Sequence, residues 1–238
     1  MVRSALRKLA SLLAPAALRV IDALAPGMIR AERMLFRLHQ LAWGAAGLHW
    51  YDHLYDHLAG PERWMWIERG FLAASLLRPG DTVLDACCGD GTYAGLFLAP
   101  RAARVDAIDA DERALARARR RWRVPGLTFR RADVLADPFP AERYDRIFFL
   151  AGLEYFTREE GDLLLDKFAR ALAPGGILFG LTPVWSGGAP SYAGLRATVA
   201  SAAELAALLR RHFPHVRLER SRDPMREQQY FTCSASPL

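Results

Sequence analysis

The stretch Thr82-Val83-Leu84-Asp85-Ala86-Cys87-Cys88-Gly89-Asp90-Gly91-Thr92 decides the fold of this chain. It predicts a buried strand at Thr82–Asp85, then a glycine-containing turn, then a helix that begins near Thr92. In a parallel α/β sheet such a turn opens a nucleotide-type site, because glycines let the backbone pass close to a ligand and the helix N-terminus offers free N–H groups. A second strand with an acidic end, Arg104–Asp109, follows about twenty residues later, where a ribose-binding carboxylate is expected.

Strands and helices alternate regularly after this stretch. Three further strands are predicted at Leu127–Arg131, Arg146–Leu150 and Ile177–Leu181. The predicted helices are Thr92–Leu98, Glu112–Arg121, Arg158–Leu172 and a last one from the capping box at Ser201 to His212. Pro174-Gly175-Gly176 predicts a turn, and His215–Arg222 with Gln228–Ser234 predicts an antiparallel hairpin. Repeated strand–helix units indicate an α/β fold with a mostly parallel sheet, helices on both faces and an antiparallel last strand.

Residues 1–60 predict a helical N-terminal extension, and residues 61–238 the main domain. Apolar residues recur at spacings of three and four on one helical face: Leu6, Leu9, Leu13, Ala17, Val20 and Leu24. Pro15 and Pro26 are expected to interrupt or kink this helix. Its basic amphipathic pattern is compatible with a lid on the main domain, with homodimer formation, and with peripheral contact to a membrane surface.

A cluster of histidines follows the extension. His49, His53 and His57 stand four residues apart, with Asp52 and Asp56 beside them. Histidines at this spacing can chelate a metal. No other ligand group converges on them, so we predict a partly buried helix with polar edges and no metal site. Tyr51 and Tyr55, a further pair at this spacing, are expected to line the mouth of the ligand pocket. The next helix, Glu62–Leu77, is expected to bury a stripe of Trp64, Ile67, Phe71, Ala74 and Leu77.

The composition limits the classes of function. The chain has 238 residues, of which 52% are hydrophobic, enough for a full core. The formal charge is +6, and nearly all the basic residues are Arg, which would suit an anionic partner. Acidic residues are interspersed among the arginines, however, and no run of Arg is interleaved with aromatic residues. Nucleic acid is therefore not expected as a partner. The three cysteines include no Cys-x-x-Cys pair, so neither a disulfide framework nor structural zinc is predicted. Without a transmembrane stretch, we expect a cytoplasmic protein that is free or membrane-associated.

Five motifs occur in the order and spacing of one known family. They are Val83–Gly91, the acidic strand end at Asp109, Arg131-Ala132-Asp133-Val134, Tyr144-Asp145-Arg146-Ile147 and Leu172-Ala173-Pro174-Gly175-Gly176. From Asp81 to the C-terminus, the chain resembles the class I S-adenosylmethionine-dependent methyltransferases. The resemblance implies a Rossmann-like, seven-stranded sheet with a reversed last strand, and S-adenosylmethionine as cofactor.

The resemblance also assigns roles to residues. The Gly-rich turn, comprising Asp85, Ala86, Cys87, Gly89 and Gly91, would accept the methionine part of the cofactor. Cys87 stands where the family has its first glycine, and its backbone is not expected to reach positive φ easily. Asp109, with Ala110, would bind the ribose hydroxyls. Asp133 and Val134 would bind the adenine, and Leu150 and Ala151 would follow the fourth strand beside the methyl group.

The reaction implied is in-line transfer of a methyl group from a sulfonium, for which proximity and alignment supply most of the catalysis. Glu154 and Tyr155 are the candidates for orienting or deprotonating the acceptor. A small-molecule acceptor, namely the N, O or C atom of a lipid, quinone or secondary metabolite, is favoured by aromatic residues in the N-terminal region and in a loop after Leu181: Trp43, Trp50, Tyr51, Tyr55, Trp64, Trp66, Trp185 and Tyr192. A nucleic-acid or protein methyltransferase, and a membrane-peripheral cofactor-binding protein without turnover, remain as alternatives.

Overall fold

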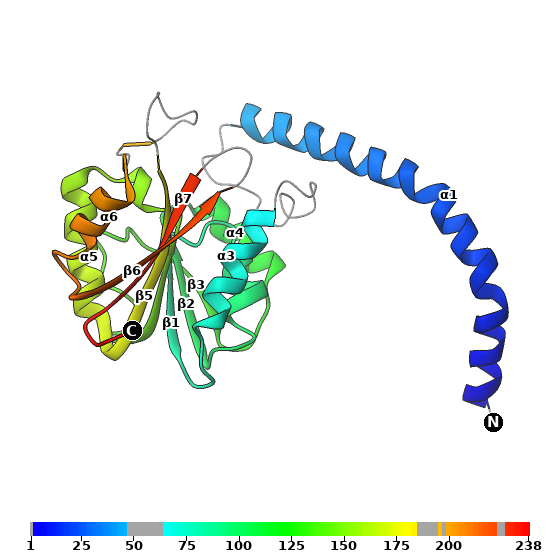
Figure 1. The fold of residues 1–238 in the computed structure, drawn as a ribbon, viewed down its shortest axis with the longest axis horizontal. Coiled ribbons are helices and arrows are strands. Elements are labelled where there is room, and N and C mark those ends of the chain that lie inside the picture. The colour runs from blue at the N-terminus through cyan, green and yellow to red at the C-terminus, as the bar shows by residue number, and fades with distance from the viewer. Residues whose placement is uncertain (1, 47–63, 185–194, 197–198, 223–226) are drawn as a thin grey trace. The chain divides into compact units, whose positions relative to one another are not determined.

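The computed structural model describes residues 2–46, 64–184, 195–196, 199–222 and 227–238. The chain divides into two compact units, and each is considered by itself. Among the described residues, the first contains the long helix α1 (Val2–Ala45). The second contains the other described helices and strands and holds the sheet predicted from the sequence (Figure 1).

A seven-stranded sheet in the order β3-β2-β1-β4-β5-β7-β6 forms the centre of the second unit. Its strands are β1 (Thr82–Ala86), β2 (Arg104–Asp109), β3 (Leu127–Arg131), β4 (Tyr144–Leu150), β5 (Leu172–Val184), β6 (His215–Arg222) and β7 (Glu227–Ser234). The pairs among β1 to β5 are parallel, whereas β7 runs antiparallel to both β5 and β6. The predicted sheet and its reversed last strand are therefore confirmed.

Helices cover both faces of the sheet. On one face lie α3 (Trp64–Ser75), the π-helix η2 (Ala94–Leu98) and α4 (Glu112–Arg121); on the other lie α5 (Arg158–Ala171) and α6 (Ala202–Leu209). Each face has its own core, with Phe148 and Leu115 in the first and Phe149 and Phe168 in the second. These neighbouring phenylalanines of β4 point to opposite faces because side chains alternate along a strand.

The strand register places the ends of β1, β2 and β4 at one edge of the sheet. Ala86 lies opposite Ile108, and Asp85 opposite Phe148. The turn after β1, the carboxylate that ends β2 and the segment after β4 therefore converge. In parallel sheets of this kind the ligand binds at the carboxyl edge, where the strand order reverses.

The fifth strand differs from its prediction. It begins at Leu172 rather than Ile177, so Pro174-Gly175-Gly176 lies inside the strand and not in a turn before it. Gly175 adopts a φ of 74°, and the pairing with β4 shifts register between Tyr144 and Arg146. These residues form an irregularity of the strand edge, for which glycine is suited because it tolerates positive φ.

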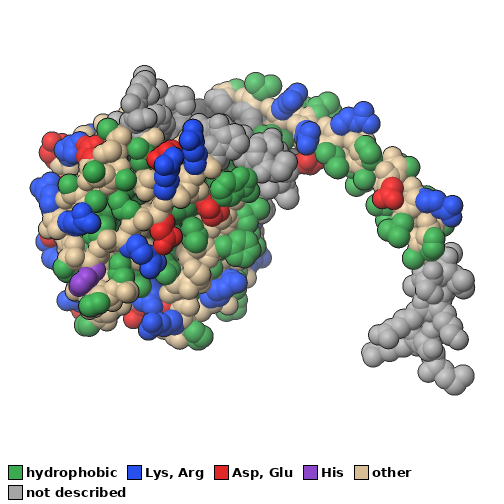
Figure 2. Space-filling model, in the orientation of Figure 1, with side chains coloured by type: hydrophobic (Ala, Val, Ile, Leu, Met, Phe, Trp, Pro, Cys, Tyr) green, Lys and Arg blue, Asp and Glu red, His purple; other side chains and the backbone are tan. Residues whose placement is uncertain are grey.

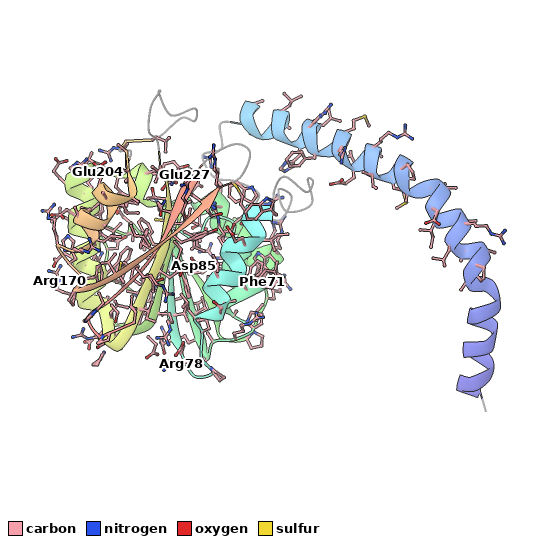
Figure 3. The ribbon with its side chains drawn as sticks, in the orientation of Figure 1. Phe71, Arg78, Asp85, Arg170, Glu204 and Glu227 are labelled. Carbon is pink, nitrogen blue, oxygen red and sulfur yellow. The ribbon has the colours of Figure 1, made fainter. Side chains whose placement is uncertain are left out.

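The buried face of α3 also differs from the predicted stripe. Trp64, Ile67 and Phe71 are 41%, 37% and 59% exposed, and Phe71 points outward in Figure 3. The helix instead buries Met65, Trp66, Arg69, Gly70, Ala73 and Ala74. Gly70 allows the close approach of η2, because an added Cβ would lie 2.5 Å from the Phe97 ring. The sequence pattern misplaced this face because one buried position is an arginine and another a glycine.

Of the two predicted effects of Pro15 and Pro26, an interruption or a kink of α1, the structure shows a bend without a break. The helix is continuous from Val2 to Ala45 and curves along its length (Figure 1). Pro15 and Pro26 fall on the same side, about three turns apart, so their effects add to one bend. In the turn after each proline an arginine side chain stabilises the helix: Arg19 Nε donates to the Pro15 carbonyl at 3.2 Å, and Arg30 Nε to the Pro26 carbonyl at 3.1 Å.

Smaller differences concern helix ends and unassigned segments. The helix after β1 is a π-helix from Ala94, and the last helix ends at Leu209 rather than His212. The histidine cluster, Tyr51, Tyr55, Trp185 and Tyr192 lie outside the described residues. Among the residues described, no group of His, Cys, Asp and Glu could hold a metal, and no helix is long and apolar enough to cross a membrane.

Candidate active site

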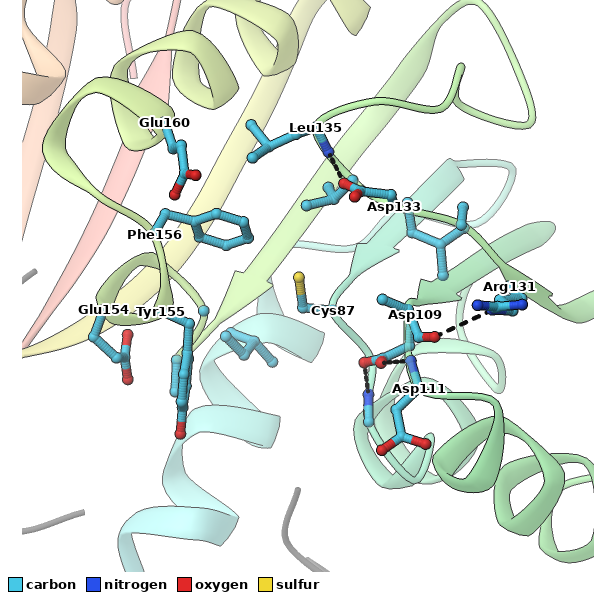
Figure 4. Close-up of a pocket in the computed structure, with 18 of the residues that line it drawn as sticks. Cys87, Asp109, Asp111, Arg131, Asp133, Leu135, Glu154, Tyr155, Phe156 and Glu160 are labelled. Carbon is cyan, nitrogen blue, oxygen red and sulfur yellow. Dashed lines mark hydrogen bonds between the residues drawn. The ribbon is translucent and has the colours of Figure 1, made fainter. Parts of the chain in front are cut away.

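A cavity of about 760 Å³ opens at the carboxyl edge of the sheet. This volume falls in the range of small-molecule sites, roughly 300–1,000 Å³. Carboxylates gather at one end, with Asp109, Asp111 and Asp133, while Glu154, Tyr155 and Phe156 form the other (Figure 4). Cys87 lies between the two ends.

The turn after β1 presents its backbone to the cavity. Gly89 has a φ of 56°, and a Cβ added there would meet nothing within 4 Å. Cys87 also has positive φ, 60°, which corrects the expectation that a cysteine would avoid this conformation. A non-glycine residue in this region carries local strain of order 1–3 kcal/mol. Burial, reinforced by Asp109 and Asp85, raises the pKa of the Cys87 thiol, which is therefore protonated at neutral pH.

Asp109 fixes the turn to the end of β2. Its Oδ2 accepts the Gly89 N–H at 2.8 Å, and its Oδ1 accepts the Asp111 N–H at 2.8 Å (Figure 4). Burial raises its pKa, while these backbone hydrogen bonds act in the opposite direction. Each carboxylate oxygen can accept a second hydrogen bond, so the side chain can hold the turn and bind two ligand hydroxyls at once.

Asp85, at the end of β1, is buried and does not line the cavity. Burial first, then the charges of Asp109 and Asp90, raises its pKa to about 8. Its Oδ2 has no hydrogen-bond partner among the described residues. A buried carboxyl oxygen without a partner is unfavourable, so a bound cation or N–H donor nearby would stabilise the ionised form.

Asp133 stands in the loop after β3 and lines the cavity. Its Oδ1 accepts the Leu135 N–H at 2.8 Å and the Ala136 N–H at 3.3 Å, which makes a local turn (Figure 4). The same carboxylate retains Oδ2 for a ligand. Arg131, two residues before Asp133, donates from Nε to the Ala110 carbonyl at 3.4 Å.

The other end of the cavity is built by the segment after β4. Ala151 has a φ of 61°, so the chain turns sharply there into the 3₁₀ helix η3 (Leu153–Tyr155). Glu154 is only 3% exposed. Its Oε2 accepts the Thr182 hydroxyl at 3.4 Å, and its carbonyl accepts the Arg196 N–H at 2.9 Å. Arg196 also pairs with Glu160 at 2.8 Å, which ties the chain after β5 to α5 at the cavity wall.

Most of the predicted site residues meet on this wall: Cys87, Gly89, Asp109, Ala110, Asp133, Val134, Leu150, Ala151, Glu154 and Tyr155. Asp85, Ala86 and Gly91 are not part of it. Gly91 instead packs inward, since an added Cβ would lie 2.5 Å from the Phe129 ring. Tyr51 and Tyr55 lie outside the described residues, so their role stays a prediction.

Several lining residues were not predicted as site residues: Trp66, Ile108, Asp111, Glu112, Arg113, Arg131, Ala132, Leu135, Gly152, Phe156, Glu160 and Arg196. Trp66 entered the sequence analysis only as one of many aromatics. Trp66 reaches the cavity because α3 buries a different face from the predicted one. On that face the Arg69 guanidinium lies 4.3 Å from the centre of the Trp66 ring. Arg196 and Glu160 could not be found from spacing, because they meet only through tertiary packing.

Residues 83–176 match the family model described as the methyltransferase domain. These residues form a methyltransferase domain. The reversed last strand agrees with this assignment, and so does the glycine turn beside a carboxylate at the end of β2.

An uncharacterized methyltransferase of Synechocystis is 33% identical to the chain over 121 residues, 51% of this chain and 54% of the relative. A 2-phytyl-1,4-naphtoquinone methyltransferase of Synechococcus elongatus is 32% identical over 133 residues, 52% of this chain and 55% of the relative. The chain thus spans about half the length of these curated relatives. The solved complex of DhpI with SAH has a TM-score of 0.60 at 22% identity, covering 87% of this chain and 97% of that one, which supports the fold.

Proposed function

We propose that this chain is an S-adenosylmethionine-dependent methyltransferase acting on an apolar, ring-containing small molecule. The observation that carries the proposal is the hydrogen bond from Gly89 N–H to Asp109 Oδ2 at the wall of the cavity. It joins an open glycine turn to a carboxylate that can accept a vicinal diol. SAH in the DhpI complex supports the choice of cofactor.

The residues present fit an adenosyl cofactor. Open space at Gly89 leaves room for a ligand against the backbone of the turn. Asp109 would bind the ribose, and Asp133 with Val134 the adenine. S-adenosylmethionine, when bound, supplies a methyl group on a positively charged sulfur.

This arrangement would place the reacting methyl group near the second end of the cavity. There Ala151, Tyr155 and Phe156 would exclude water and orient the acceptor. Held by Asp109, Asp133 and Val134, the cofactor would supply its methyl group for in-line transfer to the acceptor atom, with the sulfur as the leaving group. Glu154 would take the proton that the acceptor loses. Alignment supplies most of the rate, and proton removal adds typically about 10²–10⁴-fold.

The wall at this end favours a neutral aromatic acceptor. Trp66, Leu150, Tyr155 and Phe156 give apolar and aromatic contacts, and Glu154 with Glu160 provides the acidic groups. Around the whole cavity Asp and Glu outnumber Arg, which does not suit a nucleic-acid backbone. The naphthoquinone methyltransferase among the relatives agrees with a reduced quinone as the class of acceptor.

Transfer of labelled methyl from S-adenosylmethionine tests this function. The probes are a reduced 2-alkyl-1,4-naphthoquinone, a primary amine, total RNA and a mixed peptide pool. Label in the organic extract of the quinol reaction is the expected result. Label confined to RNA or peptide, or binding of the cofactor without any transfer, would overturn the proposal.

Replacing Glu154 with Gln separates its chemical role from packing. Gln keeps the shape and can still accept from Thr182, but it cannot take a proton. We expect kcat to fall at least about 100-fold with unchanged affinity for SAH. Glu159→Gln, an exposed carboxylate of α5, is the matched control and should keep full activity. Equal kcat for both variants would remove Glu154 from the reaction.

A further inference from the structure

The positive charge of this protein is concentrated on α1. Within Val2–Ala45 the chain carries seven basic residues against two acidic ones, which gives +5 of the formal charge of +6. The remaining residues, methyltransferase domain included, are thus almost neutral. A generally basic composition would spread positive charge over the whole chain. The concentration of charge on α1 therefore indicates a role of this helix itself.

Four arginines of α1 lie across the helix from a stripe of apolar side chains. At 100° per residue, Arg19, Arg30, Arg33 and Arg37 fall within one narrow arc, and all four are exposed. Across the helix lie Ile21, Leu24, Met28, Leu35 and Leu38, each more than half exposed. Figure 2 shows both kinds of side chain along α1. A helix with this separation is built to lie between water and an apolar phase.

The width of the apolar side argues against a second copy as its partner. Ile21, Leu24, Met28, Leu35 and Leu38 alone would form the narrow seam of a coiled coil. The positions that flank such a seam normally carry charges that select the partner. Several of these positions are apolar here, with Leu18, Val20, Met34 and Leu41 exposed between 57% and 72%, and Glu32 is the charged residue that falls beside Ile21. This broad face suits a bilayer surface better than a two-helix interface.

We infer that α1 is an interfacial helix that binds an anionic lipid membrane, with its apolar side in the bilayer surface and its arginines toward the headgroups. Basic residues are attracted to an anionic leaflet, and the burial of apolar area adds to the binding. The opposed arginine and apolar sides would place the helix along the membrane surface. None of the described helices is long and apolar enough to span a bilayer. This inference is independent of the proposed reaction.

Vesicle co-sedimentation with the full chain tests the inference, using phosphatidylcholine vesicles with and without phosphatidylglycerol. We expect binding to the anionic vesicles that weakens with salt. One variant changes Arg19, Arg30, Arg33 and Arg37 to Gln; a second changes Leu24, Met28 and Leu35 to Gln. Because Gln is a good helix former, α1 should persist in both, which circular dichroism checks. Each variant should lose at least about tenfold in affinity.

A matched control keeps the test specific. Changing Arg78, Arg120, Arg123 and Arg210, exposed arginines of the other unit, to Gln lowers the net charge by the same amount. It should bind vesicles like the wild type. An equal loss of vesicle affinity in this control would mean that the overall charge causes the binding, and it would overturn the inference. A wild type that stays in the supernatant, or that forms a dimer in sedimentation without binding vesicles, would overturn it too.

Discussion

Two residues at the carboxyl end of β1 are held in states that are unfavourable by themselves: one in its backbone conformation, the other in the burial of its side chain. Cys87 adopts a φ of 60°, a conformation that favours glycine, and Asp85 is a buried carboxyl whose Oδ2 has no hydrogen-bond partner in the described part of the chain. Both lie beside Asp109, whose charge contributes to raising both pKa values. The turn is therefore held in a conformation that costs free energy in the absence of a ligand, which is common at functional sites.

Cys87→Gly should stabilise the protein, by up to about 1 kcal/mol. Glycine removes the strain of positive φ, and its greater freedom in the unfolded chain offsets part of the gain. Cys87→Ala keeps the Cβ and the strain, so it serves as the control. Urea unfolding of both variants at one pH measures the difference. An alanine variant more stable than the glycine variant would show that Cys87 is not strained.

The pH dependence of stability should contain a contribution from Asp85. Its pKa rises from 3.8 to about 8 on folding, so the folded state binds this proton more tightly than the unfolded state. The contribution to stability is fully present below pH 3.8 and is lost as pH rises through about 8.

Asp85→Asn cannot ionise and should remove this part of the dependence. We expect the variant to gain stability relative to the wild type between pH 6 and about 8. Urea unfolding of both proteins across that interval measures it. Parallel stability curves would mean that Asp85 ionises freely in the folded protein.

At the scale of elements, the packing of α3 on η2 positions Trp66 at the cavity. An added Cβ at Gly70 would lie 2.5 Å from the Phe97 ring, which itself contacts Phe71 at 5.5 Å between ring centres. The neighbouring Arg69 is buried, and its Nη2 donates to Gln228 Oε1 at 3.3 Å. This side of α3 is fixed by one close approach and one buried polar contact.

Gly70→Ala should therefore destabilise the protein by about 1–3 kcal/mol, the usual cost of overpacking. Gly161→Ala in α5 is the comparison, because its Cβ would meet only the Leu153 side chain at 3.2 Å. Gly161→Ala should lower the free energy of unfolding by less than Gly70→Ala does. Thermal unfolding of the two variants measures the difference, and equal stabilities would show that Phe97 moves aside without cost.

The sequence allowed the elements to be predicted better than their contacts. The ranges of β2, β3, α4 and β6 agree with the prediction because glycine turns, periodicity and helix caps are local signals. The face of α3 was wrong, since Arg69 and Gly70 do not look like core residues. Residues such as Arg196 and Glu160 reach the cavity through tertiary packing, for which a single sequence carries no signal.

On the scale of the whole molecule, the two units have separate chemical characters. The methyltransferase domain holds a cavity lined by carboxylates and aromatic side chains, and α1 holds nearly all the net charge. The proposed catalysis depends on the first unit and the proposed membrane contact on the second. Variants in α1 should therefore change vesicle binding without changing the affinity for SAH, and Asp109 variants should do the reverse.

Calorimetric titration with SAH tests the central claim most directly, because the cavity is assigned to an adenosyl cofactor. The wild type should bind. Asp109→Ala should lose about 100-fold in affinity, since charge-assisted hydrogen bonds are worth about 1.5–3 kcal/mol each, and Asp109→Asn should lose less. Asp166→Ala, which removes a half-buried carboxylate of α5 that pairs with Arg170, should bind SAH like the wild type. Unchanged affinity in a folded Asp109→Ala variant, or no binding to the wild type, would contradict the claim.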